Sequence, residues 1–491
     1  MKIEEQVLEM AKRKADSAEV MYEEGETKSV HFENNKLKYI HSSSVRGIGL
    51  RVIKRGRIGF SSTTDLRNPE KFVDMAFQSA KFGQEVRFEF PSRDGFSEVK
   101  IFDKAVADYP TENAISAGKE AVEKSLADCP DYLCVVAVGR TVWTRRLLNT
   151  HGLDVSKAST TFGNGYEVML IKDKGLVAIS EGESSRKVTT GLLERVERSL
   201  EKMHLSEKEV RVTPGNYPVI FTAKTMQLLL STFEMGCNGK LVQKGISPLV
   251  GKLGEKILDE RITIYDDATV DFAIGSYPMD GEGVRSQRTP LFEKGVLKNY
   301  LFDLQTAGVM SVKSTGSGNR SFASQPAPGC TNVIVETGDM KLEDMIKDIR
   351  YGVLVDQVLG GGQSNTLAGE FSVNLDLGFL IENGKLVGRV KDCMIAGNVF
   401  DAFNNIVAIG SEAEWYGADY VPPQPSASSY ADVPLEAWFA KWVEAAQRDG
   451  LLAECEEPPN RGDPLFRPLV GLTRAEAACM MAQAKGLLPS K

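Results

Sequence analysis

Alternating apolar and polar residues, joined by very short turns, are the feature that most restricts the fold of this chain. Residues 18–43 form two strand-like runs that reverse direction near Asn34-Asn35, and residues 47–63 repeat the pattern around Arg55-Gly56. Further on, Asn383-Gly384 separates two more such runs. Two alternating runs joined by a short turn predict an antiparallel hairpin in each case. The signal is strongest at Asn383-Gly384, because Asn-Gly readily adopts the positive φ angles of a type I′ turn.

The chain of 491 residues is longer than one ordinary domain and divides at changes of composition. Residues 1–205 predict an α+β domain: an antiparallel meander exposed on one face, with helices over about 68–82 and 111–127. Residues 206–430 predict a β-rich, barrel-like domain of mostly antiparallel strands. After a Pro/Ser-rich stretch, residues 431–491 predict a helical tail, either packed on the chain or docking a partner.

Composition and charge exclude several functional classes. The formal net charge is −8 and no block of Lys and Arg stands out, which argues against direct nucleic-acid binding. The first residues form a charged amphipathic pattern rather than a signal peptide, and no apolar run is long enough to span a membrane. The seven cysteines lack CxxC spacing, which favours free thiols in a reducing cytoplasm.

Few residues of the second domain carry the chemistry of a conventional hydrolase. All four histidines (31, 41, 151 and 204) precede residue 206, so no Ser-His-Asp triad can form within 206–430. Cys237 lacks a local base to activate it. The acidic run 265–272 suits either a hard cation or turn chemistry. Asp280 and Glu282, with arginines nearby, suit either anchoring of a charged or backbone group or an internal salt-bridge network.

Two segments, 314–320 and 359–371, contain more glycine than their turns require. Glycine allows a backbone to approach a ligand, a partner strand or another domain closely. The first segment reads STGSGNR and ends at Arg320, and the second contains Gly361 and Gly362.

Ordered motifs between residues 18 and 426 resemble those of the TldD/PmbA family, whose members are described as modulators of DNA gyrase and are linked to proteolysis. The resemblance is carried by KGISPLVGKLGEKI, YDDATV, MDGEGVRSQRTPLFEKGVLKNYLFDLQTA, STGSGNR, GGGQSNTLAGEFS, GFLIENGKL and GNVFDAFNNIVAIGSEAEW. It implies an N-terminal α/β domain, a β-rich C-terminal domain and a two-subunit assembly that encloses a cavity. In the TldD type, a His-Glu-x-x-x-His helix and a later Cys hold zinc.

The zinc-motif positions fall here on Leu230, Ser231 and Met235, and YGADYVPPQPS replaces the expected Cys-Gly motif. The resemblance therefore implies the PmbA/TldE-type subunit, with no catalytic residue, metal or cofactor of its own. Leu230 and Met235 are expected to fill the space that imidazoles and metal would occupy.

The implied function is that of a non-catalytic partner of a TldD-like zinc protease, shaping a chamber for unfolded peptides. Zinc is expected only in that partner, and this chain alone is expected to form a homodimer. The candidate peptide-binding residues are Asp280, Glu282, Arg320, Gly361 and Gly362. Two alternatives stay open: a binding protein that modulates DNA gyrase or a toxin system, and a stand-alone, metal-independent peptidase.

Overall fold

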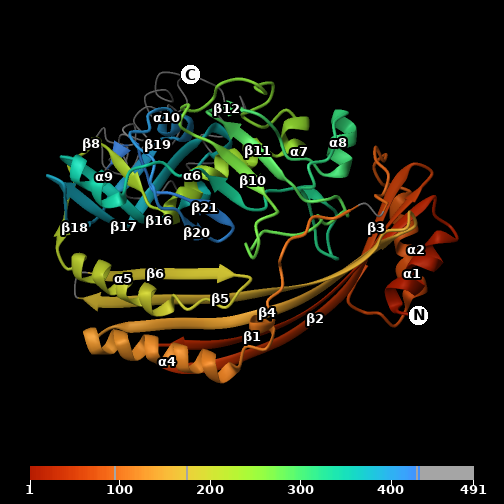
Figure 1. Ribbon diagram of the computed structural model, residues 1–491, viewed down its shortest axis with the longest axis horizontal. Helices are drawn as coiled ribbons and strands as arrows, with labels where there is room; N and C mark the ends of the chain where they lie inside the picture. The colour runs from red at the N-terminus through yellow and green to blue at the C-terminus, as the bar shows by residue number, and fades with distance from the viewer. Residues whose placement is uncertain (93–94, 173–174, 427–429, 432–491) are drawn as a thin grey trace, which may run out of the picture.

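The computed structural model describes residues 1–92, 95–172, 175–426 and 430–431. The predicted helical tail over 431–491 lies, apart from Ala431, outside these described residues. Within them the chain forms an α+β structure in which a long antiparallel sheet lies beneath a β-rich second region (Figure 1).

The first region is built on a six-stranded sheet in the order β3-β2-β1-β4-β5-β6. Every neighbouring pair is antiparallel, which confirms the predicted meander. Both predicted turns have positive φ angles, at Asn34 and Asn35 and at Arg55 and Gly56. The strands are β1 (Ser17–Glu33), β2 (Lys36–Lys54), β3 (Arg57–Thr63), β4 (Leu133–Asn149), β5 (Asp154–Lys172) and β6 (Gly175–Ser185).

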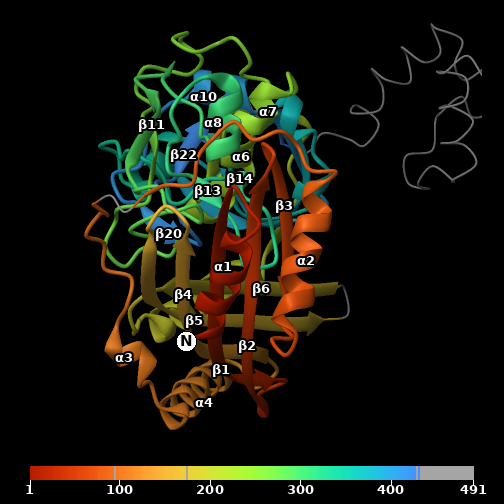
Figure 2. The ribbon, with the colours of Figure 1, turned by 90° about the vertical axis from the view of Figure 1, so that its right-hand side faces the viewer.

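Helices cover one face of this sheet. They are α1 (Ile3–Lys12), α2 (Pro69–Ala80), α3 (Lys104–Ala107), α4 (Thr111–Asp128) and α5 (Leu192–Leu205). Figures 1 and 2 show α1 and α2 at one end of the sheet and α4 at the other. Along β1, Val20 and Val30 pack in the two helix-covered cores, whereas Glu19 and Glu23 contact residues of the second region. Strand alternation therefore directs one face to the helices and the other to the second region.

The second region contains a six-stranded sheet, β12-β11-β10-β15-β21-β20, and a nine-stranded sheet whose main path is β22-β9-β16-β17-β19-β23-β8. Most pairs are antiparallel, but β15 with β21, β16 with β9 and β18 with β7 are parallel. The strands of the nine-stranded sheet are β7 (Glu209–Val210), β8 (Gly215–Asn216), β9 (Val219–Phe221), β16 (Tyr351–Leu359), β17 (Glu370–Glu382), β18 (Lys385–Val390), β19 (Met394–Asn398), β22 (Gln424–Ser426) and β23 (Tyr430–Ala431).

The six-stranded sheet and the helices complete the region. The strands are β10 (Ile264–Asp267), β11 (Arg288–Glu293), β12 (Val296–Leu297), β15 (Val333–Val335), β20 (Glu414–Tyr416) and β21 (Asp419–Val421), and a small pair joins β13 (Gly318–Asn319) to β14 (Ala327–Pro328). The helices are α6 (Ala223–Gly236), α7 (Gly239–Gln243), α8 (Leu304–Met310), α9 (Leu342–Asp348) and α10 (Val399–Asn404), with short 3₁₀ turns at Gly361–Gln363 and Thr366–Ala368. Asn383 and Gly384 have the positive φ angles expected of the predicted turn between β17 and β18.

Hydrophobic packing does not stop at the predicted boundary near residue 205. One buried cluster contains Val136 and Phe162 of the first sheet together with Leu354 and Phe379 of the second region. The two regions therefore share part of their core. In the described part of the chain, no helix is both long and apolar enough to cross a membrane.

Candidate functional site

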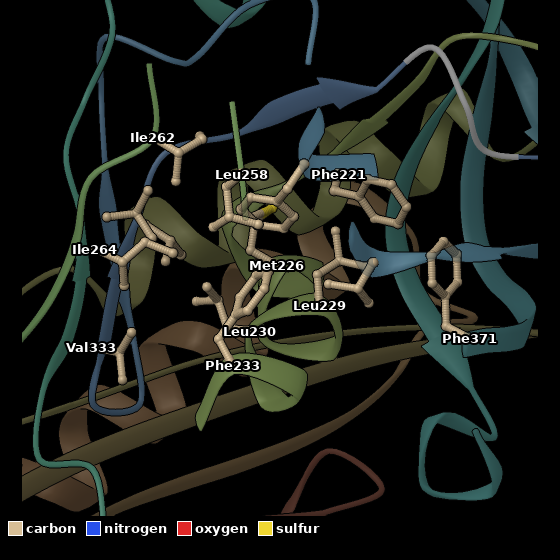
Figure 3. Close-up of a cluster of buried hydrophobic side chains, with 14 of the residues drawn as sticks. Phe221, Met226, Leu229, Leu230, Phe233, Leu258, Ile262, Ile264, Val333 and Phe371 are labelled. Carbon is tan, nitrogen blue, oxygen red and sulfur yellow. The ribbon is translucent and has the colours of Figure 1, made fainter. Parts of the chain in front are cut away.

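Helix α6 carries the three positions that correspond to the zinc motif. Leu230 is fully buried in the largest apolar cluster of the second region, beside Phe233 (Figure 3). The Ser231 hydroxyl donates a hydrogen bond of 2.8 Å to the backbone carbonyl of Leu228. Met235 is 36% exposed, so the prediction that it fills a buried gap is wrong. It lies one residue before the end of the helix, at the edge of the cluster rather than inside it.

The side chains at these positions do not suit zinc. Zn²⁺ is held in proteins by imidazole nitrogens, thiolates and carboxylates. A buried isobutyl group, a hydroxyl and a partly exposed thioether supply none of these. Among the residues that the structure describes, no group of three or more His, Cys, Asp and Glu side chains is placed to hold a metal ion.

Buried carboxyl groups adjoin the polar side of α6. Glu234 is largely desolvated, and burial raises its pKa. Asp266 of β10 and Asp419 of β21 are buried as well, and burial raises the pKa of each to about 7. The nearby charge of Glu234 contributes to both shifts. Near pH 7, Asp266 and Asp419 are therefore partly protonated, whereas free aspartates would be ionised.

The carboxylates of the acidic run 265–272 accept hydrogen bonds both from distant segments and within the local turn. The Asp266 Oδ1 atom accepts hydrogen bonds from the Thr331 amide at 2.6 Å and the Thr331 hydroxyl at 2.9 Å. The Asp267 Oδ1 atom accepts the Thr269 amide at 2.7 Å, which is the turn chemistry considered from sequence. No sequence pattern predicts that Asp266 is buried near Glu234 and Asp419, because these three residues come from separate segments.

Cys237 follows α6 and is completely buried. Burial, followed by the charge of Asp266, raises its pKa above that of a free thiol. A thiol in this environment stays protonated at neutral pH and is a poor nucleophile. The structure therefore gives Cys237 a packing role.

Asp280, Glu282 and Arg320 lie together, buried at the contact between the two regions. The Glu282 carboxylate accepts a hydrogen bond of 2.8 Å from Arg51 of β2 and one of 2.7 Å from the Leu304 amide. Arg320 donates to Glu19 of β1 and, at 2.6 Å, to the Gly281 carbonyl. The arrangement is an internal salt-bridge network that joins the first sheet to the second region. Its arginines are Arg51 and Arg320, whereas the nearby Arg285 and Arg288 considered from sequence contact Ser97 and Glu336 instead.

Asp280 stabilises the loop that carries this network. Its Oδ1 atom accepts the Glu282 and Val284 amides, each at 2.9 Å, and its Oδ2 atom accepts the Gly318 amide at 2.8 Å. Burial, followed by the charge of Glu282, raises the pKa of Asp280 to about 7. Burial lowers the pKa of Arg320 to about 10, so its guanidinium stays charged at neutral pH. Binding of a substrate by Asp280, Glu282 or Arg320 stays a prediction.

Gly361 and Gly362 form a 3₁₀ turn directly after β16. Gly360, which precedes them, has a φ of 86°, a conformation that favours glycine. A side chain added at Gly362 would meet open space, whereas one at Gly361 would come within 3.2 Å of Leu228 of α6. The turn therefore lies against α6 on one side and is open on the other. Contact of Gly361 and Gly362 with a peptide stays a prediction.

The four histidines do not come together as a site. His31 stacks on Tyr39 with ring centroids 4.5 Å apart, and His41 lies exposed on the neighbouring strand. His204 is 3.0 Å from Asp128, which raises its pKa. His151 lies edge-on to Phe90, with ring centroids 6.5 Å apart. His31 and His41 are ordinary residues of the sheet surface, as their sequence context predicts.

A large groove lies where α5 and β6 of the first region meet β16, β17, β18 and β19 of the second. Its volume is about 1170 Å³, and its lining combines apolar side chains such as Leu176, Leu359, Leu375 and Met394 with charged ones such as Arg389. The groove therefore offers both apolar and charged contacts to a ligand.

Comparison with known proteins identifies relatives of both regions. Residues 214–424 match the PmbA/TldA metallopeptidase C-terminal domain, and residues 18–80 match the PmbA/TldA metallopeptidase domain 1. An uncharacterized protein of Methanocaldococcus jannaschii is 28% identical, with 82% of this chain and 94% of the relative covered. The metalloprotease PmbA of Escherichia coli O157:H7 is 25% identical, with 83% of this chain and 90% of the relative covered.

The fold is also that of a solved structure. The crystal structure of TldE from Thermococcus kodakarensis superposes with a TM-score of 0.81 at 23% identity, covering 88% of this chain and 100% of TldE. At this level of identity the likeness concerns the fold.

Proposed function

The chain belongs to the PmbA/TldD family of metallopeptidase-like proteins, and from that premise we propose that it is a PmbA/TldE-type subunit without a zinc site of its own. In this role it pairs with a TldD-like zinc protease and shapes the chamber in which an unfolded peptide is held for cleavage. The chain itself supplies binding surface and positioning, and the partner supplies the zinc chemistry.

The observation that carries this proposal is the chemistry of α6. Leu230 packs in the apolar core at a position where a ligand would have to reach a metal, and Ser231 hydrogen-bonds to its own helix. Substituting one residue would not rebuild a metal site there, because the surrounding side chains are those of a hydrophobic core. A helix with this packing stabilises the subunit and does not catalyse.

Two features of the surface support peptide handling. The groove of about 1170 Å³ between the two regions is lined by both apolar and charged side chains, which suits a polypeptide of mixed composition. The turn at Gly361 and Gly362 lies directly after Leu359, which lines that groove. Backbone groups near glycine can approach a peptide closely, as strand addition requires.

The test is purification of this chain alone and together with a His-Glu-x-x-x-His-bearing paralogue from the same host. We expect the two chains to co-purify, and we expect cleavage of an unstructured peptide only by the pair. Chelation should abolish that cleavage without changing the unfolding of this chain alone. Stoichiometric zinc in this chain alone, with peptide cleavage that chelation removes, would overturn the proposal.

A further inference from the structure

Strand β2 has a long edge that no strand covers. β3 pairs with β2 only from Ile48 to Lys54, whereas β1 pairs with β2 along its whole length. Within the described residues no strand or isolated bridge pairs with the far side of residues 36–47. The backbone amides and carbonyls that point away from β1 in this stretch are therefore open to another strand (Figure 2).

The open part of β2 carries several exposed apolar side chains. Leu37, Tyr39, Ile40 and Val45 are between 42% and 51% exposed. Tyr39 and Ile40 are successive residues, so their side chains point to opposite faces of the sheet. Proteins usually keep edge strands short or polar, because a long apolar edge invites pairing with another chain. An edge with apolar side chains on both faces is suited to receive a strand.

The charges on this edge are all positive. Lys36, Lys38 and Arg46 are exposed, and residues 36–47 contain no Asp or Glu. We propose that the open edge of β2 binds an extended, acidic polypeptide segment as an additional strand. The inference rests on the proposed function, because the edge of β2 would be a second binding site, besides the groove, for the unfolded chains that such a subunit binds. Main-chain hydrogen bonds would hold the segment, and the three cations would select for acidic side chains.

A second copy of this chain is a poorer match for the edge. Antiparallel pairing of two β2 strands centred on His41 places Lys36 opposite Arg46 of the other copy. Like charges directly across a strand pair are destabilising. Pairing centred on Ser42 instead places Lys38 opposite Arg46, and in neither register do residues 36–47 of the other copy supply an anion. Charge complementarity therefore favours an acidic partner strand over self-association.

The inference is tested with a synthetic peptide of about ten residues in which glutamate alternates with valine, a length that spans the open edge. We expect binding by isothermal titration calorimetry, with slower amide exchange confined to residues 36–47. A peptide with lysine in place of glutamate, and one N-methylated at alternate residues, should each bind at least about tenfold more weakly. Raising the salt concentration should weaken binding of the acidic peptide.

Matched variants locate the contact on the protein. Lys36→Glu with Lys38→Glu reverses two charges on the edge, and we expect at least about tenfold weaker binding. Lys244→Glu with Lys294→Glu makes the same change of net charge at exposed positions of the second region, and should alter binding less than about twofold. Equal binding of acidic and basic peptides, exchange protection elsewhere, or dimers of the unmodified chain that bury residues 36–47 would overturn the inference. Co-purification with the zinc paralogue would be unaffected by such a failure.

Discussion

Asp266 and Asp419 are carboxyl groups that folding has removed from water. Each is at most 4% exposed, and burial raises the pKa of each to about 7. The ordinary pKa of an aspartate is 3.8, so between these values the folded chain holds protons that the unfolded chain has released. The contribution of these two groups to the free energy of unfolding therefore falls as the pH rises from about 4 to about 7.

Asp266→Asn removes one of these titrations while keeping an oxygen that can accept both hydrogen bonds from Thr331. We expect the variant to be more stable than the parent at pH 8 by about 1–3 kcal/mol, because no buried charge forms. Near pH 4 the two proteins should have similar stability. Urea unfolding at pH 4, 6 and 8 measures the difference.

The control is Asp131→Asn, which changes an exposed carboxylate. It should leave the pH dependence of unfolding as it is in the parent. If Asp266→Asn lowered stability equally at pH 4 and pH 8, the carboxyl group of Asp266 would be ionised at both pH values. Burial would then not raise its pKa.

At the scale of the element, α6 determines what the second region can do. Its buried residues include Met226, Leu229, Leu230 and Phe233, which pack against strands of both sheets of the second region. Phe233 makes edge-to-face contacts with Phe292, Phe400 and Phe403. These contacts fix the helix as part of the core, and they leave Met235 at the edge of that core.

Truncation of Leu230 and of Met235 should therefore change the free energy of unfolding by unequal amounts. Leu230→Ala removes a fully buried side chain and should lower the free energy of unfolding by about 2–5 kcal/mol. Met235→Ala removes a partly exposed one and should cost less than about 1 kcal/mol. Chemical denaturation of the two variants measures both values. Equal costs would mean that Met235 is buried in solution.

Introducing the full His-Glu-x-x-x-His motif into α6 should not create a catalytic zinc site. In Leu230→His, Ser231→Glu, Met235→His, the imidazole at 230 and the carboxylate at 231 enter an apolar or half-buried environment. We expect a loss of about 2–5 kcal/mol that comes mainly from position 230, and no peptide cleavage. Tight zinc binding together with cleavage by this variant would show that only the ligands had been lost.

At the scale of the whole molecule, many polar contacts join the first region to the second, and two of them are ion-pair clusters with buried carboxylates. The first is the network of Glu19, Arg51, Glu282 and Arg320. The second is Lys202 of α5, which lies 2.9 Å from Asp356 of β16. Because of these contacts and the shared apolar cluster, we expect the two regions to unfold as one cooperative structure.

Removal of both contacts should separate the unfolding of the two regions. Arg51→Met leaves Glu19 and Glu282 as buried anions with fewer partners, and should alone cost about 3–5 kcal/mol. We expect one calorimetric transition for the parent and two for Arg51→Met combined with Asp356→Asn. Asp74→Asn, which removes an exposed ion pair of 3.1 Å with Lys14, should leave the single transition unchanged. Two transitions in the parent would contradict the prediction.

The sequence by itself determined the features that depend on neighbouring residues. Asn and Gly tolerate positive φ angles, which explains the turns at Asn34-Asn35, Arg55-Gly56 and Asn383-Gly384. Arg55 also has a positive φ, which the turn imposes on it. The meander and the helices α2 and α4 follow from residue periodicity. The identities of Leu230, Ser231 and Met235 already indicated that α6 lacks zinc ligands.

Only the tertiary structure decided the features that depend on distant segments. Glu19 and Arg320 are 301 residues apart, and no local pattern predicts that they meet. The burial of Asp266 and the exposure of Met235 likewise depend on which elements pack against β10 and α6. Parallel pairs such as β15 with β21 and the open edge of β2 are fixed by chain topology rather than by propensity. Local chemistry selects the elements, whereas burial and pairing are properties of the assembled fold, because they depend on the surfaces that other elements remove from water.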